Sequence, residues 1–348
     1  MQIGPSEGPA CIVLVEPGLV GAACTASAGS ALGQRARRAC SRSAPQLLRS
    51  LPELLRDLRP LEIAAERRVY CRYADSIRGA DVFILQSGSP PVNDHLVELL
   101  VMIDAARLAS AHRITAVMPL YPYARQDKKS APREPVSARL VADLLQTAGA
   151  DRILAMDLHA GQIQGFFTIP VDHLTALPLF ARLYRQRGLH GEEVVSVSPD
   201  LGRVKAARRF AMMLKADFAI VTKVRPAHER AIVAEVIGDV RDKLALLGDD
   251  MVVTGGTLVA ATDALLRAGA REVRAFATHA LWTPGALEGL GRSQLAEIAV
   301  TDTVALDPKA LPSNVHVLGV GDVLGDSIRN VFGDRSVSAL FAGENELF

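Results

Sequence analysis

The chain has 348 residues, 49% of them hydrophobic, which is enough for two globular domains with cores of their own. Its 39 basic and 38 acidic residues leave a net charge of +1, which argues against nucleic-acid or membrane-surface binding through bulk charge. No apolar stretch is long enough to span a membrane, and the N-terminus lacks the positive start of a signal peptide. The four cysteines form no C-x-x-C pair, so we expect reduced thiols in the cytoplasm.

Residues 1–60 are rich in Ala, Ser, Gly and Arg and contain only a strand-like run at 11–15 and a helical pattern at 44–57. From about residue 68, short apolar strands alternate with amphipathic helices. The clearest helical patterns lie at 94–109, 136–148, 202–214 and 256–268. Because apolar strands joined by helices form parallel sheets covered on both faces, the sequence predicts an α/β fold with two doubly wound parallel sheets.

An internal repeat supports two similar domains. Residues 142–160 and 262–280 align without a gap over a helix, an Ala-Gly-Ala turn, a strand and a histidine. One supersecondary unit is therefore used in each half, as expected after an internal duplication. Two prolines interrupt the pattern within 168–190, which predicts an N-terminal domain at 1–175, divergent over 1–60, and a C-terminal domain at 176–335.

The segment 246–257 combines two features that suit a sugar phosphate. The apolar run from Leu244 to Leu247 ends in Asp249 and Asp250, and a Thr-Gly-Gly-Thr turn then opens a helical pattern. Adjacent carboxylates suit vicinal hydroxyls or a hydrated cation, whereas backbone N–H groups at a helix N-terminus suit a phosphate monoester. The alternative is an ordinary strand-turn-helix with acids on its surface.

Chemically active side chains follow other predicted strands as well. Each alone has an ordinary explanation, such as a structural histidine or a solvated basic face. In open α/β sheets, however, ligands bind at the carboxyl ends of the strands. Several predicted strands end in cations, a histidine or acids. This combination favours an enzyme that acts on phosphoryl groups and uses Mg²⁺. These side chains include Arg125, Gln126, Asp127, Lys128, Lys129, Asp157, His159, Asp200, Lys223 and Arg225.

The stretch 77–279 resembles the ribose-phosphate pyrophosphokinase family. The matching motifs are "SIRGADVFILQSG", "PYARQDKK", "MDLHAGQIQGFF", "SPDLG", "TKVR", "IGDVRDK" and "DDMVVTGGT". The resemblance implies transfer of the diphosphoryl group of ATP to the 1-hydroxyl of ribose 5-phosphate, forming phosphoribosyl pyrophosphate and AMP. It also implies two domains of phosphoribosyltransferase type, Mg²⁺ as cofactor, and a dimer-based homo-oligomer such as a hexamer.

The resemblance also implies a role for each matched residue. Catalysis would depend on Lys223 and Arg225, on a mobile loop that closes over the diphosphoryl group. Mg²⁺ would be held by His159 and Asp200. ATP would be bound by Arg125, Gln126, Arg133 and His159. Ribose 5-phosphate would be bound by Asp249, Asp250, Thr254, Gly255, Gly256 and Thr257.

Three departures from the family pattern lie in substrate-facing segments. Val253 stands in place of an acid. One residue after "SPD", this chain has Gly202-Arg203 where the family has Gly-Gly. The family's aromatic and acidic motif for a neighbouring subunit's adenine is not recognisable; its nearest counterpart, 64–68, contains only Glu66. These departures raise a second hypothesis, a weakly active or non-catalytic paralogue that assembles with an active synthetase. A phosphoribosyltransferase would share the loop at 246–257 but would leave "PYARQDKK" unexplained.

Overall fold

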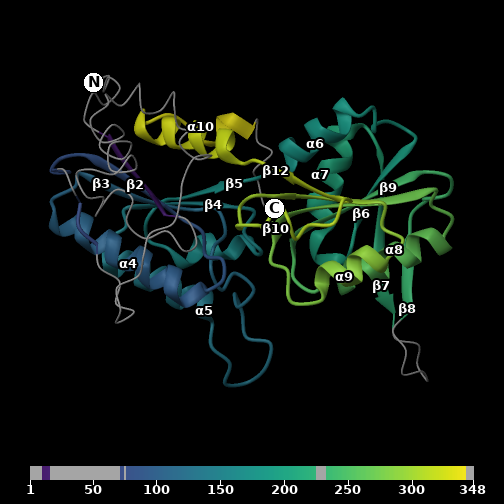
Figure 1. The fold of residues 1–348 in the computed structure, drawn as a ribbon, viewed down its shortest axis with the longest axis horizontal. Helices are drawn as coiled ribbons and strands as arrows, with labels where there is room; N and C mark the ends of the chain where they lie inside the picture. The colour runs from purple at the N-terminus through teal and green to yellow at the C-terminus, as the bar shows by residue number, and fades with distance from the viewer. Residues whose placement is uncertain (1–9, 16–70, 74–75, 225–232, 342–348) are drawn as a thin grey trace. The chain divides into compact units, whose positions relative to one another are not determined.

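The computed structural model describes residues 10–15, 71–73, 76–224 and 233–341 (Figure 1). These residues form two compact units. The first contains the described residues up to Leu174 and those from Val320 onward, and the second runs from Thr175 to Gly319. The units therefore part beside the predicted boundary at 175, but the segment from Val320, predicted as part of the C-terminal domain, belongs to the first unit.

The first unit is built on a parallel sheet, which has five strands among the described residues, in the order β1-β2-β3-β4-β5. Its helices α4 and α5 lie on one face, and α10 covers the other (Figure 1). Strands β2, β3 and β4 are buried along nearly their whole length, as in a sheet covered on both faces. The strands are Ala10–Val15, Asp81–Gln86, Arg113–Met118, Arg152–Met156 and Val171–Leu174, and the helices are α4 (Val92–Leu108), α5 (Ser137–Ala148) and α10 (Gly321–Phe332).

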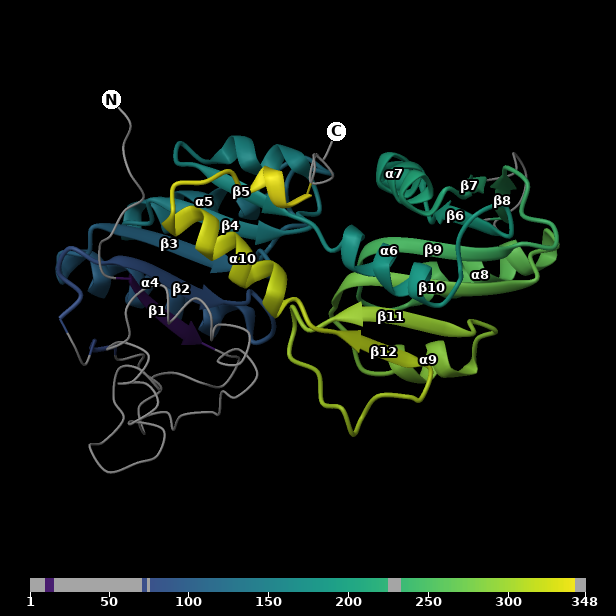
Figure 2. The same ribbon diagram turned by 90° about the horizontal axis from the view of Figure 1, so that it is seen from above.

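The second unit has a sheet with the order β12-β11-β10-β9-β6-β7-β8, which Figure 2 shows strand by strand. From β6 the chain extends toward β7 and β8, then returns to β9 on the other side of β6. The direction of winding therefore reverses between β6 and β9, and ligands bind at such a switch point in open α/β sheets. The strands β6 to β12 are Val194–Ser198, Asp217–Val224, Val233–Ile237, Leu244–Val252, Glu272–Ala280, Glu297–Thr301 and Val315–Leu318.

Helices cover both faces of this sheet too. On one face, Phe180 and Tyr184 of α6 (Leu177–Gln186) and Phe210 of α7 (Val204–Leu214) pack around Phe276 of β10. On the other face, α8 (Gly256–Arg267) and α9 (Ala286–Arg292) contribute Leu258, Leu265 and Leu290 to the core. Two layers of helix on a mainly parallel sheet confirm the predicted fold class. The exception is β8, which pairs antiparallel with β7.

The predicted helices at 94–109, 136–148 and 256–268 are confirmed, with bounds that differ by a residue or two from α4, α5 and α8. The helix predicted at 202–214 begins at Val204, because a short 3-10 turn, η2 (Leu201–Arg203), precedes it. The strand at 11–15 is β1, and the helical pattern at 44–57 lies outside the described residues.

The internal repeat is present as a helix-turn-strand unit. Gly149 and Gly269 occupy equivalent turns with φ values of 115° and 98°, which only glycine adopts readily. The two histidines differ, however. His159 follows the end of β4, whereas His279 is buried within β10 and hydrogen-bonds Thr303 at 2.9 Å.

Candidate active site

The switch point of the second sheet brings three predicted carboxylates to one edge. Asp200 follows β6, and Asp249 and Asp250 lie near the end of the adjacent strand β9. Strand β9 continues to Val252 because its pairing with β10 extends to Val252 opposite Ala280.

The two adjacent acids are shielded from solvent. The side chain of Asp250 is 2% exposed and that of Asp249 is 17% exposed. The Asp250 N–H donates to Asp249 Oδ1 at 2.8 Å, which holds the first carboxylate against the strand. Burial and the neighbouring Asp250 raise the pKa of Asp249 well above its usual range, and Arg203 opposes this shift. Such a pair needs hydroxyl donors or positive charge to be stable in its ionised form.

Arg203 supplies positive charge at this point. Its Nε lies 4.0 Å from Asp249 Oδ1 and 3.9 Å from Asp250 Oδ1, and its side chain is 17% exposed. The sequence identified Arg203 as a departure from the family pattern. Only the structure shows that the long side chain reaches the acid pair.

The turn after β9 leads directly into the N-terminus of α8. Val252 and Val253 accept backbone hydrogen bonds from Leu281 at 2.8 Å and Thr283 at 3.0 Å, which fixes the start of the turn. Gly255 then caps α8 with φ +73°, and a Cβ there would stand 3.0 Å from Leu290 Cγ. Because glycine has no side chain to cap the helix, N–H groups of the first turn remain available to a phosphate.

The other predicted residues of this turn are accessible. Thr254 and Gly256 are exposed and Thr257 is half-buried. The Thr254 hydroxyl accepts a weak hydrogen bond from the Gly256 N–H at 3.4 Å. Val253 lacks the family's carboxylate, but its carbonyl still anchors the turn through Thr283. The anchoring of this turn therefore does not need an acid at position 253.

In the first unit, the segment after β3 presents Arg125 and Gln126 to solvent. Its backbone is fixed on both sides: the Gln126 N–H donates to Tyr123 O at 2.8 Å, and Gln126 O accepts from the Ala138 N–H at 3.2 Å. Asp127 is buried and accepts a short hydrogen bond from the Gln162 side chain. Gln162 belongs to η1 (Gly161–Phe166), so the structure joins the "PYARQDKK" and "MDLHAGQIQGFF" motifs.

His159 is half-buried and lies between the end of β4 and η1. Because β3 and β4 are paired in parallel, their following segments emerge from the same edge of the sheet. Arg133 is exposed in the segment between β3 and α5, with φ +68°. The structure thus places Arg125, Gln126 and His159 after neighbouring strands, with Arg133 farther along the exposed segment.

The position of Lys223 differs from the prediction. We expected Lys223 on a mobile loop, but its backbone lies in β7, opposite Ala234 of β8. The antiparallel pairing with β8 extends the strand past the apolar run that marked its predicted end. The side chain of Lys223 and all of Arg225 lie outside the described residues.

The predicted Mg²⁺ ligands belong to different units. Oδ1 of Asp200 accepts from the N–H groups of Gly202 at 2.8 Å and Arg203 at 3.2 Å, and His159 belongs to the other unit. Within the described ranges, no three His, Cys, Asp or Glu side chains are grouped so as to hold a metal.

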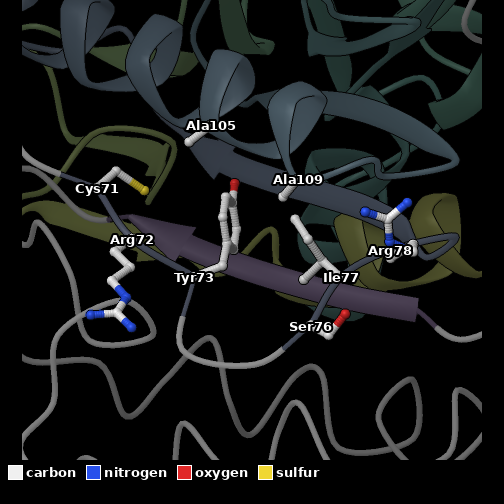
Figure 3. A pocket seen from close by; sticks show the side chains of 8 residues that line it. All are labelled: Cys71, Arg72, Tyr73, Ser76, Ile77, Arg78, Ala105 and Ala109. Carbon is white, nitrogen blue, oxygen red and sulfur yellow. The ribbon is translucent and has the colours of Figure 1, made fainter.

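Two residues that shape the site were not predicted. Gln162 anchors Asp127, and its signal was present within the quoted "HAGQIQGFF" motif. Thr283 fixes Val253 through its N–H and, at 3.2 Å, through its hydroxyl, yet it lies about 30 positions along the chain and carries no local signal. A pocket of about 340 Å³ in the first unit is lined by none of the predicted site residues (Figure 3).

The second sheet therefore defines a class: an α/β protein with an acid pair and a glycine-capped helix N-terminus at the switch point of a mainly parallel sheet. The family model for the N-terminal domain of ribose phosphate pyrophosphokinase matches residues 59–149. The phosphoribosyl synthetase-associated domain matches residues 194–342. The chain belongs to the ribose-phosphate pyrophosphokinase family, as its motifs predicted.

Individual relatives cover most of the chain. It is 48% identical over 273 residues to the ribose-phosphate pyrophosphokinase of Fusobacterium nucleatum, covering 78% of this chain and 86% of that protein. Against the enzyme of the same name from Clostridium acetobutylicum, identity is 45% over 270 residues, 78% of this chain and 85% of that one. The crystal structure of phosphoribosylpyrophosphate synthetase from Mycobacterium smegmatis matches with a TM-score of 0.74 and 40% identity, covering 84% of this chain and 97% of that one.

Proposed function

We propose that the protein transfers the diphosphoryl group of ATP to the 1-hydroxyl of ribose 5-phosphate, which forms phosphoribosyl pyrophosphate and AMP. The observation that carries this proposal is the buried acid pair followed directly by the Gly255-capped helix, in a chain of this family. The two features match the two ends of a sugar phosphate, its vicinal hydroxyls and its phosphate. Relatives of similar length bear the corresponding enzyme name.

For the sugar phosphate, Asp249 and Asp250 accept hydrogen bonds from the 2- and 3-hydroxyls. The segment from Thr254 to Thr257 encloses the 5-phosphate, with Gly255 and Gly256 allowing the backbone to approach closely. Hydroxyl donors compensate the burial of the carboxylates, because a buried acceptor is stable only when it is hydrogen-bonded. The sugar is thereby oriented for attack by its 1-hydroxyl.

For ATP, Arg125, Gln126, Arg133 and His159 provide the contacts. The guanidinium groups of Arg125 and Arg133 are exposed, so they are available to polyphosphate, which arginine binds through paired N–H donors. When bound, Mg²⁺ would neutralise phosphate charge, with His159 holding the ion at the ATP phosphates and Asp200 holding a second ion near the ribose. In-line transfer needs positioning and charge stabilisation more than a covalent nucleophile, and the predicted residues supply both.

Lys223 and Arg225 stabilise the charge that develops on the transferred group. Two cations close together in the sequence are suited to this role, because electrostatic stabilisation of the transition state is commonly the largest catalytic effect. Lys223 and Arg225 are two positions apart, so one short segment can present both.

We also propose that the protein acts as a dimer-based homo-oligomer in the cytoplasm. Helix α5 exposes Leu140 by 59% and Leu144 by 37%, one turn apart, and α4 exposes Val97 by 49%. Neighbouring exposed apolar side chains commonly mark protein interfaces. Light scattering after gel filtration tests the assembly, with Leu140→Asp as the variant expected to shift it. No helix of the described residues is long and apolar enough to cross a membrane.

The deciding experiment combines purified protein with ATP, Mg²⁺ and ribose 5-phosphate and measures AMP. We expect AMP to form only when the sugar phosphate is present, with phosphoribosyl pyrophosphate in equal amount. Production of ADP instead would indicate transfer of a single phosphoryl group and would contradict the proposal. A protein that binds ribose 5-phosphate but forms neither product would also contradict it.

A further inference from the structure

Arg203 forms ion-pair contacts with both carboxylates of the acid pair, at 4.0 and 3.9 Å. We propose that Arg203 is a built-in counter-cation, which allows Asp249 and Asp250 to accept the sugar hydroxyls without help from a divalent cation. This role rests on the proposed function, because it concerns how the same site binds ribose 5-phosphate. It makes Arg203 a positioning residue for the substrate rather than a catalytic one.

The first step of the argument is the position of the guanidinium. Nε of Arg203 lies at almost equal distances, 3.9 and 4.0 Å, from oxygens of the two carboxylates, so it acts on both. Its backbone is fixed by the Asp200 carboxylate, which accepts from the Arg203 N–H at 3.2 Å at the start of α7. The cation is thus held by the fold at the acid pair and does not have to be recruited from solution.

The second step is the charge balance of the site. Two adjacent carboxylates, one of them 2% exposed, repel each other strongly when both are ionised in a shielded place. An arginine is always protonated in proteins, so its compensation does not depend on pH or on metal concentration. A carboxylate has lone-pair sites for several donors, and the pair can therefore serve a guanidinium and sugar hydroxyls together.

Two other ionisable side chains near β9, within the described residues, have different partners. On β6 and η2, Asp200 is an acid and its Oδ1 is directed to backbone N–H groups. On β10, the neighbour of β9 on its other side, His279 hydrogen-bonds Thr303. A glycine at position 203, as in the family pattern, would leave charge compensation to a bound cation.

The test is a titration of ribose 5-phosphate into the full-length protein, without ATP, in EDTA and in millimolar MgCl₂. Calorimetry gives the affinity. Fluorescence of Trp282, the single tryptophan, gives a second readout. Its neighbours Leu281 and Thr283 donate backbone hydrogen bonds to Val252 and Val253 at the start of the turn before α8. The variants are Arg203→Met, which removes the charge but keeps the length, and Arg203→Lys, which keeps the charge. Arg208→Met, on an exposed arginine of α7, controls for loss of one positive charge.

We expect the unmodified protein and Arg208→Met to bind the sugar phosphate with similar affinity in both buffers. Arg203→Met should bind about tenfold or more weakly in EDTA, the scale of losing one partner of a shielded charge pair, and should recover in MgCl₂. Arg203→Lys should stay close to the unmodified protein, which excludes a purely structural effect of substitution.

Two results would overturn the inference. If Arg203→Met and the unmodified protein respond to MgCl₂ in the same way, Arg203 does not compensate the acids, although the proposed function stands. If the unmodified protein binds no ribose 5-phosphate in either buffer, the proposed function fails and the role of Arg203 fails with it.

Discussion

Asp250 shows how a single buried side chain can carry substrate recognition. It is 1% exposed and belongs to a strand whose other residues form the core, so its carboxylate is stable only with hydrogen-bond donors or positive charge around it. In the proposed complex the sugar hydroxyls are those donors. The cost of burying the acid is thus offset by the substrate that it selects.

Replacing Asp250 by Asn should therefore weaken ribose 5-phosphate binding by about 1–3 kcal/mol, because an amide N–H₂ cannot accept a hydroxyl hydrogen bond as the carboxylate does. Calorimetric titration measures the effect. Asp239→Asn, at an exposed carboxylate of the same unit, is the control and should leave the affinity unchanged. Equal affinities for both variants would mean that the acid pair does not contact the sugar.

Asp249 makes the stability of the ligand-free protein dependent on pH. Its pKa is raised from 3.8 to about 8, chiefly by burial, so the folded protein holds a proton that the unfolded chain has released. The folded state binds more protons in this range, and its free energy of unfolding must fall as pH rises from about 4 toward 8. Asn at position 249 cannot ionise, so the Asp249→Asn variant does not lose free energy of unfolding in this way as pH rises.

We expect Asp249→Asn to gain stability relative to the unmodified protein as pH increases from 5 to 8. Urea unfolding at both pH values, followed by Trp282 fluorescence, gives the two differences in free energy. Ribose 5-phosphate must be absent, since a bound ligand would change the ionisation of the pair. Parallel stability curves for the two proteins would show that Asp249 titrates normally.

Strand β9 brings the acids into place through close packing just before them. A Cβ on Gly248 would stand 2.3 Å from Cζ of Phe276, the ring at the centre of the aromatic cluster with α6 and α7. Any larger residue at position 248 must push this ring away. The strand can therefore pass close under the aromatic cluster only with glycine at this position.

Gly248→Ala should lower the free energy of unfolding by about 1–3 kcal/mol, the usual cost of overpacking a core. Gly289→Ala is the matched control, because nothing lies within 4 Å of a Cβ at that position in α9. Alanine in a helix is favoured over glycine, so this variant should gain up to about 1 kcal/mol. Urea unfolding measures the change in the free energy of unfolding for both variants. No change for Gly248→Ala would mean that Phe276 repacks freely.

Lys223 and Arg225 are the two proposed catalytic cations, and the backbone of Lys223 lies in β7. If Lys223 acts on the transition state, Lys223→Ala should reduce kcat about 100-fold or more, with little change in affinity for ribose 5-phosphate. Steady-state AMP formation and calorimetric binding provide the two measurements. A normal kcat with a raised KM for the sugar phosphate would assign Lys223 to substrate binding instead.

At the scale of the whole molecule, the chain returns to its first unit after completing the second. Arg113 of β3 holds this return: its Nη2 lies 2.5 Å from Asp81 Oδ2, and its Nη1 lies 2.8 Å from Asp334 Oδ1 beyond α10. The same Nη2 donates to Val331 O at 3.3 Å. One guanidinium thus connects two adjacent strands with the C-terminal helix.

Arg113→Met should destabilise the first unit by about 3 kcal/mol, because it removes the guanidinium that pairs with the buried Asp81. Asp334→Asn should cost less than about 1 kcal/mol, since that carboxylate is 53% exposed. Circular dichroism reports on both units, whereas Trp282 reports on the second. An Arg113→Met effect that appears equally in Trp282 fluorescence would contradict a role confined to the first unit.

Features that depend on neighbours along the chain could be predicted from the sequence. The periods of apolar residues predicted α4, α5, α8 and most of α7, and Gly149 and Gly269 marked turns that need positive φ. The Thr-Gly-Gly-Thr turn indicated a phosphate site for the same reason, since backbone N–H groups at a helix start are a local property. The motifs of the family were equally visible, because they are contiguous.

Features that depend on distant parts of the chain were decided by the tertiary structure. The extension of β9 past its acids follows from pairing with β10, and the placement of Lys223 in β7 follows from pairing with β8. The ion pair of Arg203 with the acids crosses the switch point between β6 and β9, and α10 returns to the first sheet. Strand order and the direction of a long side chain depend on which elements meet in space, and local patterns of hydrophobicity do not contain that information.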